Sequence, residues 1–210
     1  MRYVLLACLL CTFHSWAQDS TKVRRWSVIY KPLGSVSPAL ANHTFGVQYE
    51  ISESFIAEVD VGLIKTWYDL HLFSDKDASS TGFKLSAELK FILVDGLYVA
   101  LQGFYNDYTK ESEEYVWRFG ETYQEKMDIE KFITSWGVHT KAGYLLKRPN
   151  KKFFFDFYVG IGFRQKIIEA SDLPDDVTLE NESNASPADE IPGTYIYPSV
   201  SLGAAVGYTF

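Results

Sequence analysis

Cysteine, positive charge and long apolar runs are all scarce in this chain. Only two cysteines occur in 210 residues, Cys8 and Cys11, and removal of the first residues would leave no thiol. That excludes disulfides and thiolate chemistry from the remaining chain. Acidic residues outnumber basic ones, 27 to 20, so the formal net charge is −7. Nucleic-acid binding requires a basic face, and we therefore expect no nucleic-acid partner.

The one long apolar run lies at the N-terminus. Residues 3–13 are almost wholly apolar, follow Met1 and Arg2, and precede the small-x-small triplet Ser15-Trp16-Ala17. This layout is typical of a secretory signal peptide, and it predicts a signal at 1–17 and a mature domain at 18–210. The run is too short to span a bilayer as a helix. Cys8 lies too early in it for a lipoprotein box, so we expect no lipidation.

Helical periodicity is missing from the rest of the chain, which alternates apolar and polar residues instead. A period of two is typical of strands that have one apolar face. The clearest case is the C-terminal segment, where Val200, Leu202 and Val206 alternate with serine, glycine and alanine. Comparable alternation predicts eight strands, at 25–33, 44–51, 55–66, 83–93, 97–106, 133–146, 153–164 and 199–210.

The connections between these strands alternate in length. Short turns are expected at 52–54, 94–96 and 147–152, and longer connections at 34–43, 67–82, 107–132 and 165–193. Short turns at one rim and long loops at the other are typical of outer-membrane proteins. We therefore predict an all-β fold, a closed up-and-down antiparallel eight-stranded transmembrane β-barrel. Both termini would be periplasmic and the long loops extracellular.

The distribution of side-chain size decides which face of such a barrel points inward. A lipocalin-like soluble barrel would bury the apolar face, whereas a membrane barrel would expose it to lipid. The apolar faces carry many large rings, among them Trp26, Phe91 and Trp136, and an eight-stranded interior is too narrow for them. The opposite faces carry small residues, including Gly46, Gly62, Gly137, Gly143, Gly160, Gly162, Gly203 and Gly207. This distribution favours the membrane barrel.

Charged residues share the small-residue face, where acids and bases can pair across the lumen. An outward Lys or Arg at the bilayer midplane would cost roughly 2–4 kcal/mol. Near-balanced signs predict a plugged lumen that does not conduct, stabilised by pairs that include Asp156 and Arg164. The predicted lumen network consists of Glu58, Asp60, Lys84, Glu88, Lys90, Lys141, Asp156 and Arg164.

The mature chain resembles the small outer-membrane barrel proteins typified by OmpX and the OmpA transmembrane domain. The resemblance rests on the terminal run that ends Gly207-Tyr208-Thr209-Phe210 and covers the whole mature chain in layout. It implies that Tyr208 and Phe210 form the signal recognised by the barrel-assembly machinery. It also implies contact with outer-membrane lipid and roles in envelope integrity, adhesion or docking with a larger envelope complex.

Chemistry-bearing motifs are sparse. His43, His71 and His139 have no zinc-site spacing, and we find no nucleophile–base–acid set on an outward face. The acidic segment 165–193 lacks the ligand spacing of an ordered calcium loop, and the aromatic segment 107–132 fits either a recognition loop or a long hairpin. We expect no catalytic residue, cofactor or metal. The prediction is a non-enzymatic structural or accessory subunit, with a lipid-modifying enzyme or a narrow pore as alternatives.

Overall fold

The described part of the chain is built of β-strands. The computed structural model describes residues 26–32, 42–65, 79–118, 123–147, 152–171, 177–178 and 191–210. The predicted signal at 1–17 lies outside these residues, as do 172–176 and 179–190 of the acidic segment. None of the described residues belongs to a helix long and apolar enough to cross a membrane. The strands are β1 (Trp26–Lys31), β2 (Asn42–Glu50), β3 (Phe55–Lys65), β4 (Ser79–Val94), β5 (Leu97–Arg118), β6 (Tyr123–Lys147), β7 (Phe153–Ala170), β8 (Val177–Thr178) and β9 (Gly193–Thr209).

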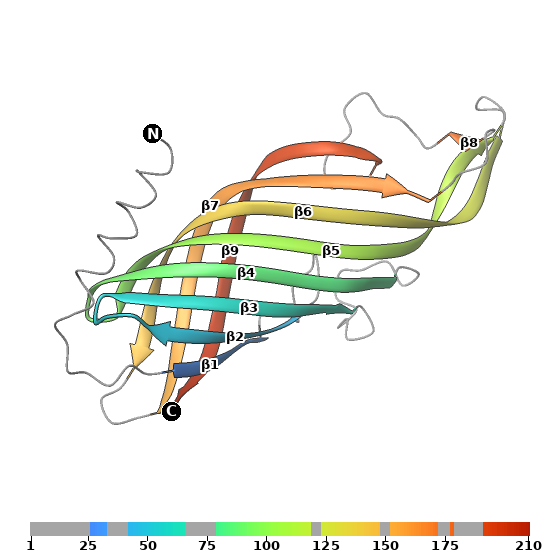
Figure 1. Ribbon diagram of the computed structural model, residues 1–210. Helices are drawn as coiled ribbons and strands as arrows, with labels where there is room; N and C mark the ends of the chain where they lie inside the picture. Colours follow the sequence, from blue (N-terminus) through green and yellow to red (C-terminus); the bar gives the residue numbers. More distant parts are fainter. Residues whose placement is uncertain are drawn as a thin grey trace, which may run out of the picture.

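Eight of these strands form a closed ring of antiparallel hydrogen-bonded pairs. Consecutive strands pair from β1 through β7, β7 pairs with β9, and β9 returns to β1. Figure 1 shows the strands side by side and strongly tilted in one curved sheet. The predicted all-β antiparallel fold and its eight strands are confirmed at this level. The two-residue β8 was missed; it pairs with the far end of β5 and lies outside the ring.

The short connections at 52–54 and 94–96 lie at one rim, as predicted, whereas 148–151 of the third lie outside the described residues. At the turn between β4 and β5, Asp95 and Gly96 both have positive φ, 48° and 86°. Two such residues produce the tight hairpin whose twist matches that of the flanking strands. Trp26 pairs with Tyr49 beside the turn between β2 and β3, and Phe210 bonds to the Trp26 carbonyl. The start of β1 and the C-terminus therefore lie at this short-turn rim.

Residues 107–118 and 123–132 form the two paired arms of a hairpin, one of the two structures expected for this segment. β5 has 22 residues and β6 has 25, and they stay paired from Leu97↔Tyr144 to Arg118↔Tyr123. β3, in comparison, has 11 residues. The hairpin consequently extends well beyond the other strands at the long-loop rim (Figure 1).

The outer face of the ring carries an apolar belt with aromatic residues at both edges. Toward the long-loop rim, Phe45, Tyr105 and Trp136 lie in one continuous cross-strand row. Aliphatic residues such as Val59, Leu89, Leu101 and Val138 occupy the middle of the belt and are exposed. Toward the short-turn rim, ring pairs lie 4.5–5.1 Å apart between centroids: Trp26–Tyr49, Phe55–Phe91 and Phe153–Tyr208.

The inner face interlocks glycines with large side chains from neighbouring strands. Gly203 lies directly against the Tyr158 ring, Gly207 against Phe154, and Gly46 against the Asp60 carboxylate. A side chain at any of these glycines would overlap its neighbour, so the narrow ring accommodates each large group where the adjacent strand has none. Gly103 points outward, and a Cβ there would meet no atom within 4 Å.

Candidate functional site

The interior of the ring holds a buried cluster of ion pairs at mid-height. The Lys90 ammonium contacts the carboxylates of Asp156 and Glu58, the latter at 2.7 Å. All three side chains are about 1% exposed. They come from β4, β7 and β3, so this contact joins strands far apart in the ring. In a low-dielectric interior, each of these charges depends on the others for stabilisation.

A second cation, Lys31 at the end of β1, pairs with the carboxylates of Glu58 and Asp60. Its ammonium lies 2.5 Å from Glu58 and 2.7 Å from Asp60. Gln48 donates to the other Glu58 oxygen at 2.5 Å, and Ser86 donates to Asp60 at 2.8 Å. Sequence reasoning did not single out Lys31. The alternation of Trp26 and Tyr30 on the outer face was the available signal, because it places residue 31 inside.

Lys141 is the third cation described inside the ring, and it pairs with Glu88. The Lys141 ammonium donates to Glu88 at 2.6 Å and lies 4.1 Å from the centroid of the Tyr158 ring. The Tyr98 hydroxyl donates to Asp156 at 2.7 Å, and the Lys90 ammonium lies 5.1 Å from the Tyr98 ring. The predicted lumen network included neither tyrosine; Tyr98 is buried and Tyr158 half-buried. They fit inside because Gly143 and Gly203 lie against their rings.

Two members of the predicted network do not join these pairs. Among the described residues, no hydrogen bond or ion pair reaches the Lys84 ammonium or the Arg164 guanidinium. Arg164 instead lies 4.9 Å from the centroid of the Phe104 ring, and its buried Nε has no partner. Within the described part of the chain, Arg164 is therefore not paired with an acid. The acids are already engaged by Lys31, Lys90 and Lys141, and Arg164 on β7 stands opposite Gly137 and Tyr197 instead.

The histidines occupy unrelated positions. His139 is buried; its Nε2 lies 2.6 Å from the Ser199 hydroxyl, and its ring stacks on Phe104 at 4.8 Å. The Ser199–His139 distance suits a nucleophile and base, but His139 Nδ1 has no partner among the described residues, so no orienting acid completes the set. His43 bonds to the Tyr30 hydroxyl at 3.0 Å, whereas His71 lies outside the described residues. Within the part of the chain that is described, no group of three or more His, Cys, Asp or Glu residues is placed to hold a metal ion.

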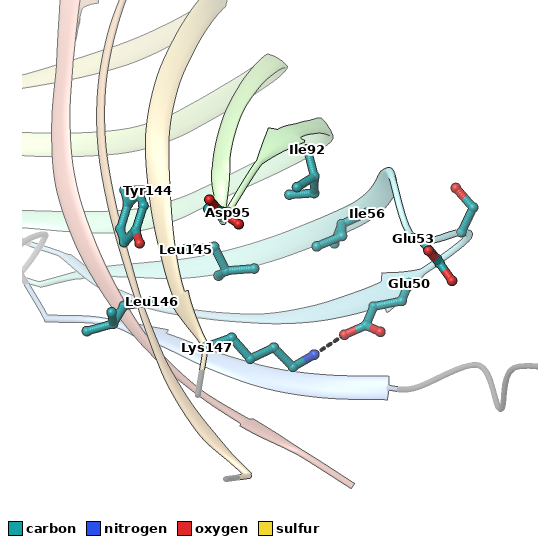
Figure 2. Close-up of a pocket in the computed structure, with 11 residues that line it drawn as sticks. Glu50, Glu53, Ile56, Ile92, Asp95, Tyr144, Leu145, Leu146 and Lys147 are labelled. Carbon is teal, nitrogen blue, oxygen red and sulfur yellow. Dashed lines mark hydrogen bonds and ion pairs between the residues drawn. The ribbon is translucent and has the colours of Figure 1, made fainter. Parts of the chain in front are cut away.

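Two cavities lie on opposite sides of the ion-pair cluster. The first, about 430 Å³, opens at the short-turn rim between the ends of β2, β4 and β6. Figure 2 shows its lining, which includes Ile56, Ile92 and Leu145 as well as the Glu50–Lys147 ion pair. The second, about 170 Å³, lies toward the long-loop rim and is lined by polar side chains that include Lys84, His139 and Arg164. The two linings share no residue.

Apolar side chains pack across the interior at the long-loop end. Ile64, Tyr108, Ile133 and Ile168 form a buried cluster, with Tyr195 packed against it. These residues come from β3, β5, β6, β7 and β9, so the cluster spans the lumen. Buried Lys131 and Lys166 lie on the same strands and were not predicted, because the strands continue beyond the expected ends at 133 and 164.

The proposed assembly residues lie at the seam of the ring. Tyr208 and Phe210 face each other edge-on, with centroids 5.5 Å apart, at the end of β9. β9 pairs with both β7 and β1, so this strand closes the ring. No known protein family and no curated protein matches the sequence. The resemblance to the OmpX and OmpA type therefore rests on the layout and on this terminal run.

Proposed function

We propose that the protein is an integral outer-membrane β-barrel with a side-chain-plugged lumen. In this proposal it is a structural or accessory subunit, without enzymatic activity, that docks with envelope partners. The observation that carries the proposal is the inverted distribution of polarity. Glu58, Lys90 and Asp156 are buried inside, whereas the outer face exposes an apolar belt.

The belt has the arrangement that a bilayer requires. Transmembrane strands of about 9–11 residues present an apolar band bordered by aromatic girdles at both interfaces. β3 has 11 residues and points Val59, Val61 and Leu63 outward, each about half exposed. In water, a belt of this extent around the whole ring would be an aggregation site, whereas lipid satisfies it.

The interior supports a plugged lumen. Charged pairs at mid-height and the apolar cluster near the long-loop rim both lie across the path between the two ends. The cavities on either side of the ion-pair cluster share no lining residue. This arrangement favours a structural or accessory role over a narrow pore.

The hairpin of β5 and β6 supports docking with a partner. Its strands run past the apolar belt, because outward positions turn polar at Asp107 and Glu130. The extension carries charges such as Lys126 and Glu113, which pair in an exposed position, and a half-buried Trp117. A projecting hairpin with both aromatic and charged groups is suited to protein recognition.

The test is location and folding state in a Gram-negative host. The expressed protein should be recovered in the outer-membrane fraction and should run at different positions in SDS gels before and after heating. Excision of 113–128 with an Asn-Gly turn in their place should preserve both properties, because Ser112 and Ile129 are already paired. The same excision should abolish copurification of envelope partners in mild detergent. Recovery as a soluble periplasmic protein would overturn the membrane proposal and favour a lipocalin-like barrel.

A further inference from the structure

The cavity of about 170 Å³ is lined by cations without any acid to balance them. Its charged lining residues are Lys31, Lys84 and Arg164, and its lining residues include no Asp or Glu. Lys31 is already engaged by Glu58 and Asp60. Lys84 and Arg164 are therefore the groups whose charge is left uncompensated at this cavity.

Lys84 is placed where its charge is repelled by its neighbours. Lys31 and Arg164 line the same cavity, so their like charges oppose that of Lys84. Lys84 is half-buried, and a cation withdrawn from water without a partner is costly, because it loses hydration that no opposite charge replaces. A compact anion in the cavity would supply one.

Other polar groups around the cavity also lack partners. His139 Nδ1 and Arg164 Nε are buried and make no hydrogen bond within the described part of the chain. Gln102 and Tyr158 contribute an amide and a hydroxyl to the same lining. Together with the two cations Lys84 and Arg164, the Gln102 amide and the Tyr158 hydroxyl can donate to the several oxygens of a phosphate-type oxyanion, to which guanidinium and ammonium groups bind strongly.

The cavity adjoins the part of β9 that has one described neighbour. Residues 200–204 contribute to the lining, and β1 pairs with β9 only from Val206 to Thr209. Among the described residues, no strand pairs with 193–205 on the β1 side. Val200 and Leu202 are accordingly 74% and 77% exposed, more than the outward residues in fully paired strands. This edge of β9, at 193–205, lies between the cavity and the surroundings of the ring.

We propose that this cavity binds a phosphate-type oxyanion through Lys84 and Arg164, either as a free solute or as the headgroup of a lipid. The inference goes beyond the proposed function, and it concerns the ring interior whatever the protein docks with. Arg164 provides the planar fork of donors and Lys84 the point charge.

Thermal unfolding of the folded protein in nonionic detergent tests the proposal. Sodium phosphate should raise the unfolding temperature by several degrees at about 100-fold excess over Kd, and sodium chloride at matched ionic strength should not. In a second arm, phosphatidic acid in the micelles is compared with diacylglycerol of the same chains. A response to inorganic phosphate assigns the site to a solute, and a response to phosphatidic acid alone assigns it to a lipid headgroup.

Variants separate binding from a structural role. Lys84→Met should lose the response and, without ligand, unfold at the same or a higher temperature, because it removes an unpaired cation. Arg164→Gln should lose the response independently, and the exposed Lys126→Met should retain it. No stabilisation by either probe, or an undiminished response in both Lys84→Met and Arg164→Gln, would overturn the proposal.

Discussion

At the residue scale, the inner face of the ring contains charged side chains that form ion pairs and others that, among the described residues, do not. Lys90, Glu58 and Asp156 stabilise one another, because each carboxylate lies within reach of an ammonium. Lys84 and Arg164 have no carboxylate partner in the described part of the chain. A charged residue on the inner face therefore contributes to stability chiefly when it belongs to an ion pair. Substitution of a paired residue should lower the free energy of unfolding more than substitution of an unpaired one.

Replacement of Asp156 measures this difference. Asp156→Ala leaves Lys90 with one acid fewer and removes the acceptor of Tyr98, so it should lower the free energy of unfolding by about 3–5 kcal/mol. Arg164→Ala should cost about 0.5–2 kcal/mol, because it removes a cation–π contact and no ion pair. Urea unfolding in detergent provides both values, with exposed Glu113→Ala as the control. Equal losses for Asp156 and Arg164 would contradict the assignment of partners.

Glycine replacement tests the interlocked interior. Gly203→Val should destabilise the protein by about 1–3 kcal/mol, because the added side chain overlaps the Tyr158 ring. Gly103→Val is the matched control on the outer face, where a Cβ meets no atom within 4 Å. In the Tyr158→Leu background, the cost of Gly203→Val should fall, which a double-mutant cycle would detect. A similar cost at Gly103 would show that glycine is required in the strands for another reason.

At the scale of elements, β9 is the strand that closes the ring. It pairs with β7 along its length and with β1 over its last residues, so it converts a sheet into a ring. Phe210, which follows β9, donates its backbone N–H to the Trp26 carbonyl at 3.0 Å, and its ring contacts that of Tyr208. Closure of the ring therefore depends on a short stretch at the extreme C-terminus.

Deletion of Phe210 tests this dependence together with the proposed assembly signal. The truncated chain should reach the outer membrane in severely reduced yield, because it loses both the terminal bond and the ring contact with Tyr208. Ile196→Ala is a suitable control, since Ile196 is an outward residue of the same strand in the part that β1 does not pair with. Yield is read from the heat-shifted band in outer-membrane fractions. An unchanged yield after deletion would remove Phe210 from the signal.

At the scale of the whole molecule, the interior of the ring has a cavity on each side of the ion-pair cluster. The cavity at the short-turn rim and the cationic cavity, which is lined by Lys31, Lys84 and Arg164, are separated by Lys90, Glu88, Lys141 and their partners. The apolar cluster lies beyond the second cavity. In the proposed membrane orientation, a solute entering from either end would meet buried, mutually bonded side chains.

Planar-bilayer recording addresses the closed middle directly. The folded wild-type protein should show no stable conductance steps, because passage requires the ion-pair cluster to separate. Asp156→Ala should lower the unfolding temperature and still show no stable conductance steps. Long-lived steps in the wild type would refute the plugged lumen and favour the narrow pore.

Alternation along the chain determined the strands, their faces and the short-turn rim. A period of two assigns each side chain to one face without reference to any other strand, which is why Glu58, Lys90 and Asp156 were placed inside correctly. Asp95-Gly96 predicted a tight turn, because positive φ is a local requirement. Strand ends at the long-loop rim were not predictable in this way. β5 and β6 continue with polar residues such as Asp107 and Glu130 on the outward face, and they stay paired with each other.

Only the tertiary structure decided which interior charges meet. Asp156 and Arg164 lie on one strand and one face, yet Asp156 reaches Lys90 across the ring while Arg164 stacks on Phe104. The reason is register and tilt, which set the height of every residue relative to strands far away in the sequence. The cationic cavity has the same origin, since it arises where β1 stops at Lys31 and the acids are already paired. Alternation assigns a face to each residue, but it carries no information about height or partner.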